Sequence, residues 1–137
     1  MKKTIGLVNC SGACYPAILA KLSCNQTAIQ NKSKFTEICF TEHATALLSG
    51  DSKAIDNSQK SFDKYGDIIA VSGCGACCAT KLLNMFGITP FDLRIAEDLN
   101  VESMTPPFKI KKINKLNDKL EEAVQLIVET ANWCDSE

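Results

Sequence analysis

Two short stretches of this chain repeat one local arrangement of cysteines. Residues 10–14 (CSGAC) and 74–78 (CGACC) each follow an apolar run and precede a helix-forming segment. Each stretch holds two cysteines four residues apart, and residues at that spacing share one face of a helix. Unpaired amides at a helix N-terminus stabilise thiolates, the form of cysteine that binds metals or attacks electrophiles. The pattern therefore predicts two equivalent strand-to-helix turns that carry thiolates.

A third cysteine, Cys39, lies near the end of another strand-like run, residues 35–40. Period-two alternation puts it on the face opposite Ile38 and Phe40. In an open parallel sheet, ligands collect at the carboxyl ends of the strands, near the point where the strand order reverses. Three segments could thus deliver thiols to one edge, and their shared placement makes Cys10, Cys39, Cys74 and Cys78 candidates for one thiolate site rather than independent core residues.

Other residues are weaker candidates for the same site. Cys14 and Cys77 are further candidate ligands, while Cys24 and Cys134 lie far from the turns and are expected to be core residues. His43 follows Cys39 by four residues, and an imidazole can ligate zinc. We favour a structural role for His43, in which it covers or caps the helix that follows.

The cysteine chemistry admits more than one use. Four thiolates suit tetrahedral zinc, and they equally suit an iron–sulfur cluster. Cys74 and Cys77 also form a C-x-x-C at a helix start after a strand, the spacing of a redox dithiol. The residues assign no catalytic group and leave open whether the protein is an enzyme.

The elements that must position these cysteines alternate along the chain. Strands are expected at residues 4–9, 35–40, 67–72 and 91–96, and helices at residues 15–22, 43–48, 51–65, 76–86 and about 113–131. The alternation predicts an α/β fold in three layers, with a mostly parallel open sheet of about four strands, flanking helices and an amphipathic C-terminal helix. Pro106, Pro107 and a basic stretch (Lys109, Lys111, Lys112, Lys115) precede that helix.

Length and charge narrow the remaining classes. Residues 1–137 are about the length of a single domain, and we expect one. The net charge of −1 gives no field to attract nucleic acid. Neither a signal peptide nor a membrane span is expected, so we expect a cytoplasmic protein without a membrane partner. Eight cysteines in a reducing compartment are more often metal ligands or redox groups than disulfides.

From about Thr4 to Val101 the chain resembles the DGC-domain family of small cysteine-rich, zinc-associated proteins. The most specific segment is residues 69–81 (IAVSGCGACCATK), which looks like the family's apolar strand with its D-G-C and C-A-x-K elements. The resemblance implies zinc, with Cys10, Cys39, Cys74 and Cys78 as the metal-binding positions. This chain departs from the naming motif at Ser72, where the family has an aspartate.

Three hypotheses follow. The first is a metal-binding protein with a Cys-rich site for zinc or an iron–sulfur cluster, used in redox, sulfur or metal handling. The second is a thiol redox enzyme or sulfur carrier in which Cys74 attacks and Cys77 or Cys78 resolves. The third is an interaction module that docks a redox or metal-handling protein through its C-terminal helix. Self-association into a homo-oligomer is a further candidate.

Overall fold

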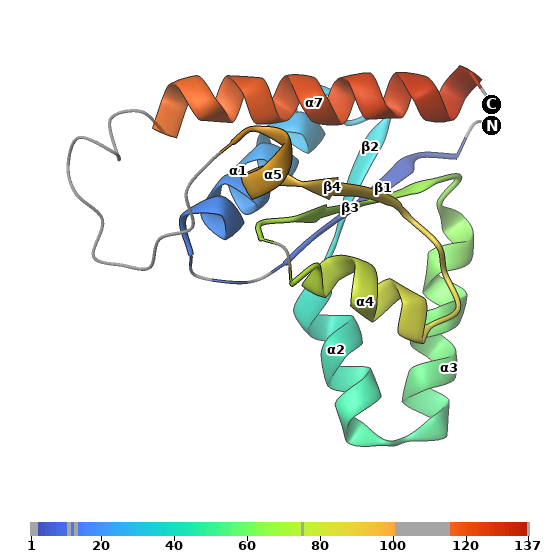
Figure 1. Ribbon diagram of the computed structural model, residues 1–137. Helices are drawn as coiled ribbons and strands as arrows, with labels where there is room; N and C mark the ends of the chain where they lie inside the picture. The colour runs from blue at the N-terminus through green and yellow to red at the C-terminus, as the bar shows by residue number, and fades with distance from the viewer. Residues whose placement is uncertain (1–2, 11, 13, 75, 101–115, 137) are drawn as a thin grey trace.

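The computed structural model of the protein describes residues 3–10, 12, 14–74, 76–100 and 116–136. In chain order its elements are β1 (Ile5–Asn9), α1 (Tyr15–Gln30), β2 (Phe35–Ile38), α2 (Phe40–Ser49), α3 (Ser52–Ser61), η1 (Phe62–Lys64), β3 (Ile68–Ser72), α4 (Cys78–Met85), β4 (Phe91–Arg94), α5 (Ile95–Asp98) and α7 (Leu116–Ser136). The four strands form one parallel sheet in the order β2-β1-β3-β4 (Figure 1). The predicted α/β class and the open sheet are confirmed.

The sheet is the middle of three layers. Alternate strand residues such as Leu7 and Val71 pack with α1, α5 and α7 on one face. Their neighbours Val8 and Ala70 pack with α2, α4 and η1 on the other face, where α3 also lies (Figure 1). β3 is buried along its whole length, as its nearly continuous apolar sequence predicts for a central strand.

The strand order reverses between β1 and β3. The chain moves from β1 outward to β2, then returns to β3 on the other side of β1 and continues to β4. As a result α1 leaves β1 on one face of the sheet, while α4 leaves β3 on the opposite face (Figure 1). Such a switch point opens a crevice outside the carboxyl ends of the two strands, where ligands bind in open α/β sheets.

In both cysteine turns the first cysteine lies before the helix: α1 begins at Tyr15, as predicted, and α4 at Cys78, two residues later than predicted. Cys14 is the N-cap of α1, and Cys10 directly follows β1, so Cys10 and Cys14 do not share a helix face. Helix α4 likewise begins at Cys78, after Cys77. The expectation that each cysteine pair lies on one helix face was wrong. Pro16 explains part of the start of α1, because proline suits the first turn of a helix.

Other boundaries also shift. The second strand ends at Ile38, with Cys39 as the N-cap of α2. The fourth ends at Arg94 rather than residue 96, because the Arg94 amide donates to the Asp98 carboxylate (2.9 Å) and the chain turns into α5. The first helix is longer than predicted, and the third resolves into α3 and η1. Gly75, Ile113 and the proline and lysine stretch before α7 lie outside the described residues.

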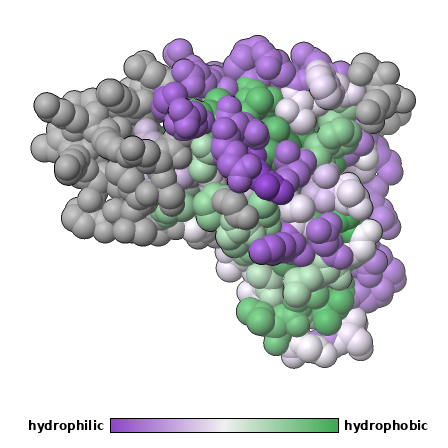
Figure 2. Space-filling model, in the orientation of Figure 1, coloured by the Kyte–Doolittle hydropathy of each residue, from purple (hydrophilic) through white to green (hydrophobic). Residues whose placement is uncertain are grey.

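The predicted C-terminal amphipathic helix is confirmed as α7. Its residues Ala123, Ile127 and Ala131 are fully buried in the cluster that includes Leu19 and Cys24 of α1. No helix in the described ranges is long and apolar enough to cross a membrane. Figure 2 shows polar residues over much of the visible surface and apolar residues gathered toward the α2–α3 hairpin, where Leu48 is 88% exposed.

Candidate metal centre

Cys10 lies at the switch point itself. It directly follows β1, and its amide donates to the Val71 carbonyl of β3 (3.4 Å), extending the strand pairing. The Cys10 sulfur accepts a hydrogen bond from the Gly73 amide (3.0 Å), and the side chain is buried. Burial raises the pKa of the Cys10 thiol, an effect that backbone hydrogen bonds from Gly73 and Gly12 partly oppose.

Gly73 holds the end of β3 against the start of α1. A Cβ atom at Gly73 would stand 2.4 Å from the Ala17 nitrogen and 2.6 Å from its Cα, so no side chain fits there without moving backbone. The Gly73 carbonyl also accepts a hydrogen bond from the Ala96 amide (2.9 Å). One glycine therefore joins β3 to α1, to α5 and to the Cys10 sulfur.

Two further cysteines lie at helix starts beside Cys10. Cys14, half-buried, is the N-cap of α1, and Cys78, exposed, is the first residue of α4. Both thiols contribute to the raised pKa of Cys10, after the larger effect of burial. Cys74, half-buried, follows Gly73 directly. Of the four predicted ligands, the structure thus gathers Cys10, Cys74 and Cys78 around the ends of β1 and β3.

Cys77 has an unusual backbone. It is a buried non-glycine residue in the left-handed region (φ 52°, ψ 47°), and its amide donates to the Cys74 carbonyl (3.2 Å). Burial raises the pKa of Cys77, as does Asp92, whereas Arg94 lowers it. Strained backbone of this kind clusters at functional sites.

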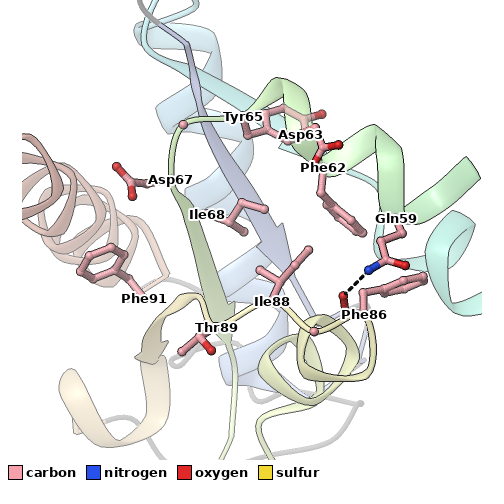
Figure 3. Close-up of a pocket in the computed structure, with 12 residues that line it drawn as sticks. Gln59, Phe62, Asp63, Tyr65, Asp67, Ile68, Phe86, Ile88, Thr89 and Phe91 are labelled. Carbon is pink, nitrogen blue, oxygen red and sulfur yellow. Dashed lines mark hydrogen bonds between the residues drawn. The ribbon is translucent and has the colours of Figure 1, made fainter. Parts of the chain in front are cut away.

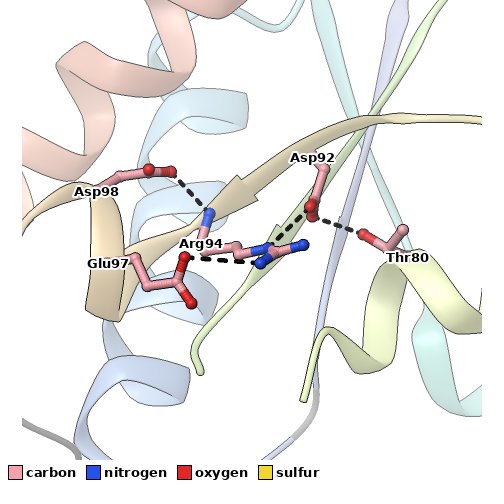
Figure 4. A network of polar contacts seen from close by, with 5 residues as sticks. All are labelled: Thr80, Asp92, Arg94, Glu97 and Asp98. Carbon is pink, nitrogen blue, oxygen red and sulfur yellow. Dashed lines mark hydrogen bonds and ion pairs between the residues drawn. The ribbon is translucent and has the colours of Figure 1, made fainter. Parts of the chain in front are cut away.

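A polar network lies at the end of β4 (Figure 4), and its Asp92 and Arg94 act on the pKa of Cys77. Asp92 accepts hydrogen bonds from the Thr80 hydroxyl (2.7 Å) and from Arg94 (3.0 Å), and Arg94 also pairs with Glu97 (3.6 Å). Sequence reasoning missed this network. The available signal was Arg94 at the end of a strand between two acidic residues, a pattern equally typical of a solvated surface.

Cys39 has different surroundings. It is exposed and lines a cavity of about 330 Å³ with Asn9, Lys21, Asn25 and Glu37. Burial raises the pKa of Glu37, while Lys21 lowers it. The pairing of Val8 with Ile38 aligns Cys39 with Asn9 rather than with Cys10. Cys39 is therefore at the predicted edge of the sheet but in a neighbouring cavity on the α1 side.

His43 lies in the helical layer formed by α2, α3 and α4. Its Nδ1 contacts the Ser58 hydroxyl (3.0 Å), and its ring packs on Phe62 with a centroid distance of 4.5 Å. Burial lowers the pKa of His43. These contacts support the structural role that we favour from the sequence, although they do not test its use as a ligand.

The remaining cysteines agree with a core role. Cys24 is fully buried in the α1–α7 cluster, and Cys134 is buried on α7.

A separate cavity of about 380 Å³ opens at the amino edge of the sheet, lined by residues such as Phe62, Asp67 and Phe91 (Figure 3). None of the described residues that line it is a cysteine, and Cys10, Cys39, Cys74 and Cys78 lie at the opposite edge.

The candidate ligands are thiols, which suit a thiophilic metal, but their side chains are not arranged for binding in this structure. The thiols around the two helix starts provide ligands. The helix starts and the backbone amides stabilise the negative charge that the thiolates would carry. Among the residues that the structure describes, however, no three Cys, His, Asp or Glu side chains stand in a ligating arrangement. Metal binding would therefore require the candidate ligand side chains to rearrange.

Comparison with known proteins yields one assignment. Searches of curated proteins and of solved structures found no significant match. The family model described as the DGC domain matches residues 6–127, which include the switch point and all four predicted ligands. The chain belongs to the DGC domain family.

Proposed function

We propose that the protein binds a thiophilic metal at the carboxyl edge of its sheet, with Cys10, Cys39, Cys74 and Cys78 as ligands. Zinc is the leading candidate and an iron–sulfur cluster is the alternative. The observation that carries the proposal is Cys10, a buried thiol at the switch point with an amide donor on its sulfur and two helix-start cysteines beside it. Membership in a cysteine-rich family is compatible with it.

The ligand set decides what the metal does. Four protein thiolates would make a structural or storage site, whereas three with an open position would supply Lewis-acid chemistry. Cys39 is the deciding residue, because it lies in a neighbouring cavity. A cytoplasmic location, a redox or metal-handling protein partner and a homo-oligomer stay predictions.

The first experiment is anaerobic purification followed by metal analysis and a visible spectrum. If the metal is zinc, the protein is colourless and holds one equivalent of zinc. Broad visible absorbance would instead identify the cofactor as an iron–sulfur cluster. We expect Cys10→Ser to lose stoichiometric metal and Cys24→Ala, a buried cysteine in the core, to retain it. Loss of metal in Cys39→Ser supports four ligands, and its retention reduces the set to three.

A second candidate function is thiol redox or sulfur transfer with Cys74 as nucleophile. It is favoured by the turn in which the Cys77 amide bonds the Cys74 carbonyl, since this holds the attacking and resolving residues together. Protein purified without metal, with one rapidly alkylated thiol that is lost in Cys74→Ser, would support this function and reject the first.

A further inference from the structure

Ser72 is the one buried side chain of the described residues whose polar atom has no hydrogen-bond partner. It is 1% exposed. The other buried serine and threonine hydroxyls of the described residues are paired: Ser23 donates to the Ala20 carbonyl (3.0 Å), Thr27 to the Ser23 carbonyl (2.7 Å), and Ser58 contacts His43 (3.0 Å). An unpaired buried hydroxyl is costly, so Ser72 calls for an explanation.

The position of Ser72 points to the candidate metal centre. It is the last residue of β3, and the pairing of Asn9 with Val71 makes Cys10, which directly follows β1, its lateral neighbour. Neighbouring strands lie about 4.8 Å apart. The Cys10 sulfur is 3.0 Å from the amide nitrogen of Gly73, the residue after Ser72. The unpaired hydroxyl is therefore at the switch point, beside the thiol that carries the proposed function.

We infer that Ser72 is a positioning residue of the metal centre, whose hydroxyl donates a hydrogen bond to a ligand thiolate once that centre is assembled. The inference rests on the proposed function. A neutral thiol is a weak acceptor, whereas an ionised group makes hydrogen bonds about twice as strong. The side chain thus gains its partner when metal binding draws a ligand sulfur within hydrogen-bond distance of the hydroxyl. Partners of this kind orient metal ligands and tune their donor strength.

This role predicts opposite effects of one substitution on two properties. Ser72→Ala removes an unpaired hydroxyl from the metal-free protein, so its melting temperature should rise by about 3–5 °C. The same change should weaken zinc binding by about 10-fold or more, measured by competition with a chromophoric chelator. With cobalt in place of zinc, the sulfur-to-metal charge-transfer band should move to lower energy, because a thiolate without the hydrogen bond is a stronger donor.

Two variants serve as controls. Ser23→Ala removes an equally buried hydroxyl that is already paired, and it should leave zinc affinity and the cobalt band unchanged without raising the melting temperature. Ser72→Thr keeps the hydroxyl and adds a buried methyl group. It should restore the cobalt band and most of the zinc affinity even if the metal-free protein melts lower.

The outcomes separate this inference from the function on which it rests. If wild type binds zinc and Ser72→Ala binds it equally, with an unshifted cobalt band, the hydroxyl pairs only with buried water and the inference is overturned. If wild type and Ser23→Ala both fail to bind zinc or cobalt and carry no iron–sulfur cluster after anaerobic purification, the proposed function itself is rejected, and the inference with it.

Discussion

At the scale of single residues, the site depends on backbone positions as much as on sulfur. Gly73 admits the first turn of α1 and gives its amide to Cys10, and Cys77 turns the chain into α4 through a left-handed conformation. Neither property is visible in a list of thiols. Both can be tested by substitutions that leave every proposed ligand in place.

Gly73→Ala should be strongly destabilising. The new Cβ would lie 2.4–2.6 Å from backbone atoms of Ala17, and backbone cannot give way as a flexible side chain does. We expect a loss of about 3 kcal/mol or more in the free energy of unfolding, measured by urea denaturation. Gly66→Ala is the control, because its nearest contact would be an ordinary 3.5 Å. Equal effects of the two changes would refute the close approach.

Strain at Cys77 can be measured by comparing two replacements. Both Cys77→Ala and Cys77→Gly remove the thiol, but only glycine adopts a φ of +52° without steric cost. We expect the glycine variant to be more stable than the alanine variant by about 1 kcal/mol in thermal or urea unfolding. At ordinary backbone positions the order is reversed, so a more stable alanine variant would show that no strain is stored there.

At the scale of elements, hydrophobic patterning predicted the presence of the strands better than it predicted their ends. The apolar runs located all four strands, because burial of a strand leaves a direct record in its sequence. The ends of elements depend on single contacts instead: the bond between the Arg94 amide and Asp98 shortens β4 and creates α5. Such a bond is set by the local path of the chain, which periodicity does not encode.

The candidate site also has a part that the sequence predicts and a part that it does not. Parallel strand ends predict that Cys10 and Cys74 share an edge, and topology places both at the switch point. The separation of Cys39 from Cys10 could not be predicted, because it follows from the register between β1 and β2. Register is a tertiary property, and a shift of one residue moves a side chain to the other face.

The packing of α7 on α1 gives a prediction at this scale. Ile127 is fully buried in the cluster that joins the two helices to the sheet. Ile127→Ala should cost about 2–5 kcal/mol in unfolding free energy, because it removes buried methyl groups and leaves a cavity. Glu121→Ala, at an exposed position of α7, should stay within about 0.5 kcal/mol of wild type. A small loss for Ile127→Ala would mean that α7 is not an integral layer.

At the scale of the whole molecule, buried thiols make stability sensitive to alkaline pH. Burial raises the pKa of Cys10, Cys24 and Cys77 above the ordinary value of 9.0. Above that pH the unfolded chain releases these protons while the native protein keeps them. Unfolding therefore releases protons, and stability falls as pH rises, by up to about 1.4 kcal/mol per pH unit for each thiol.

Cys24 gives the cleanest measurement, because it is fully buried and is not a proposed ligand. Urea unfolding of the metal-free protein between about pH 8 and pH 10.5 should show a shallower decline for Cys24→Ala than for wild type. The difference between the two slopes removes the titration of lysine and tyrosine, which both proteins share. Parallel curves would mean that the native protein ionises Cys24 as readily as the unfolded chain does.

The hydrogen bond between Gly73 and Cys10 can form only at a late stage of synthesis. The two residues are 63 positions apart, so Cys10 leaves the ribosome long before its partner exists. Until β3 has been made and has paired with β1, Cys10 is an ordinary exposed thiol on a growing chain, open to oxidation and to chance metals. The proposed metal site is thus complete only once β3 and α4 have emerged, late in the synthesis of the chain.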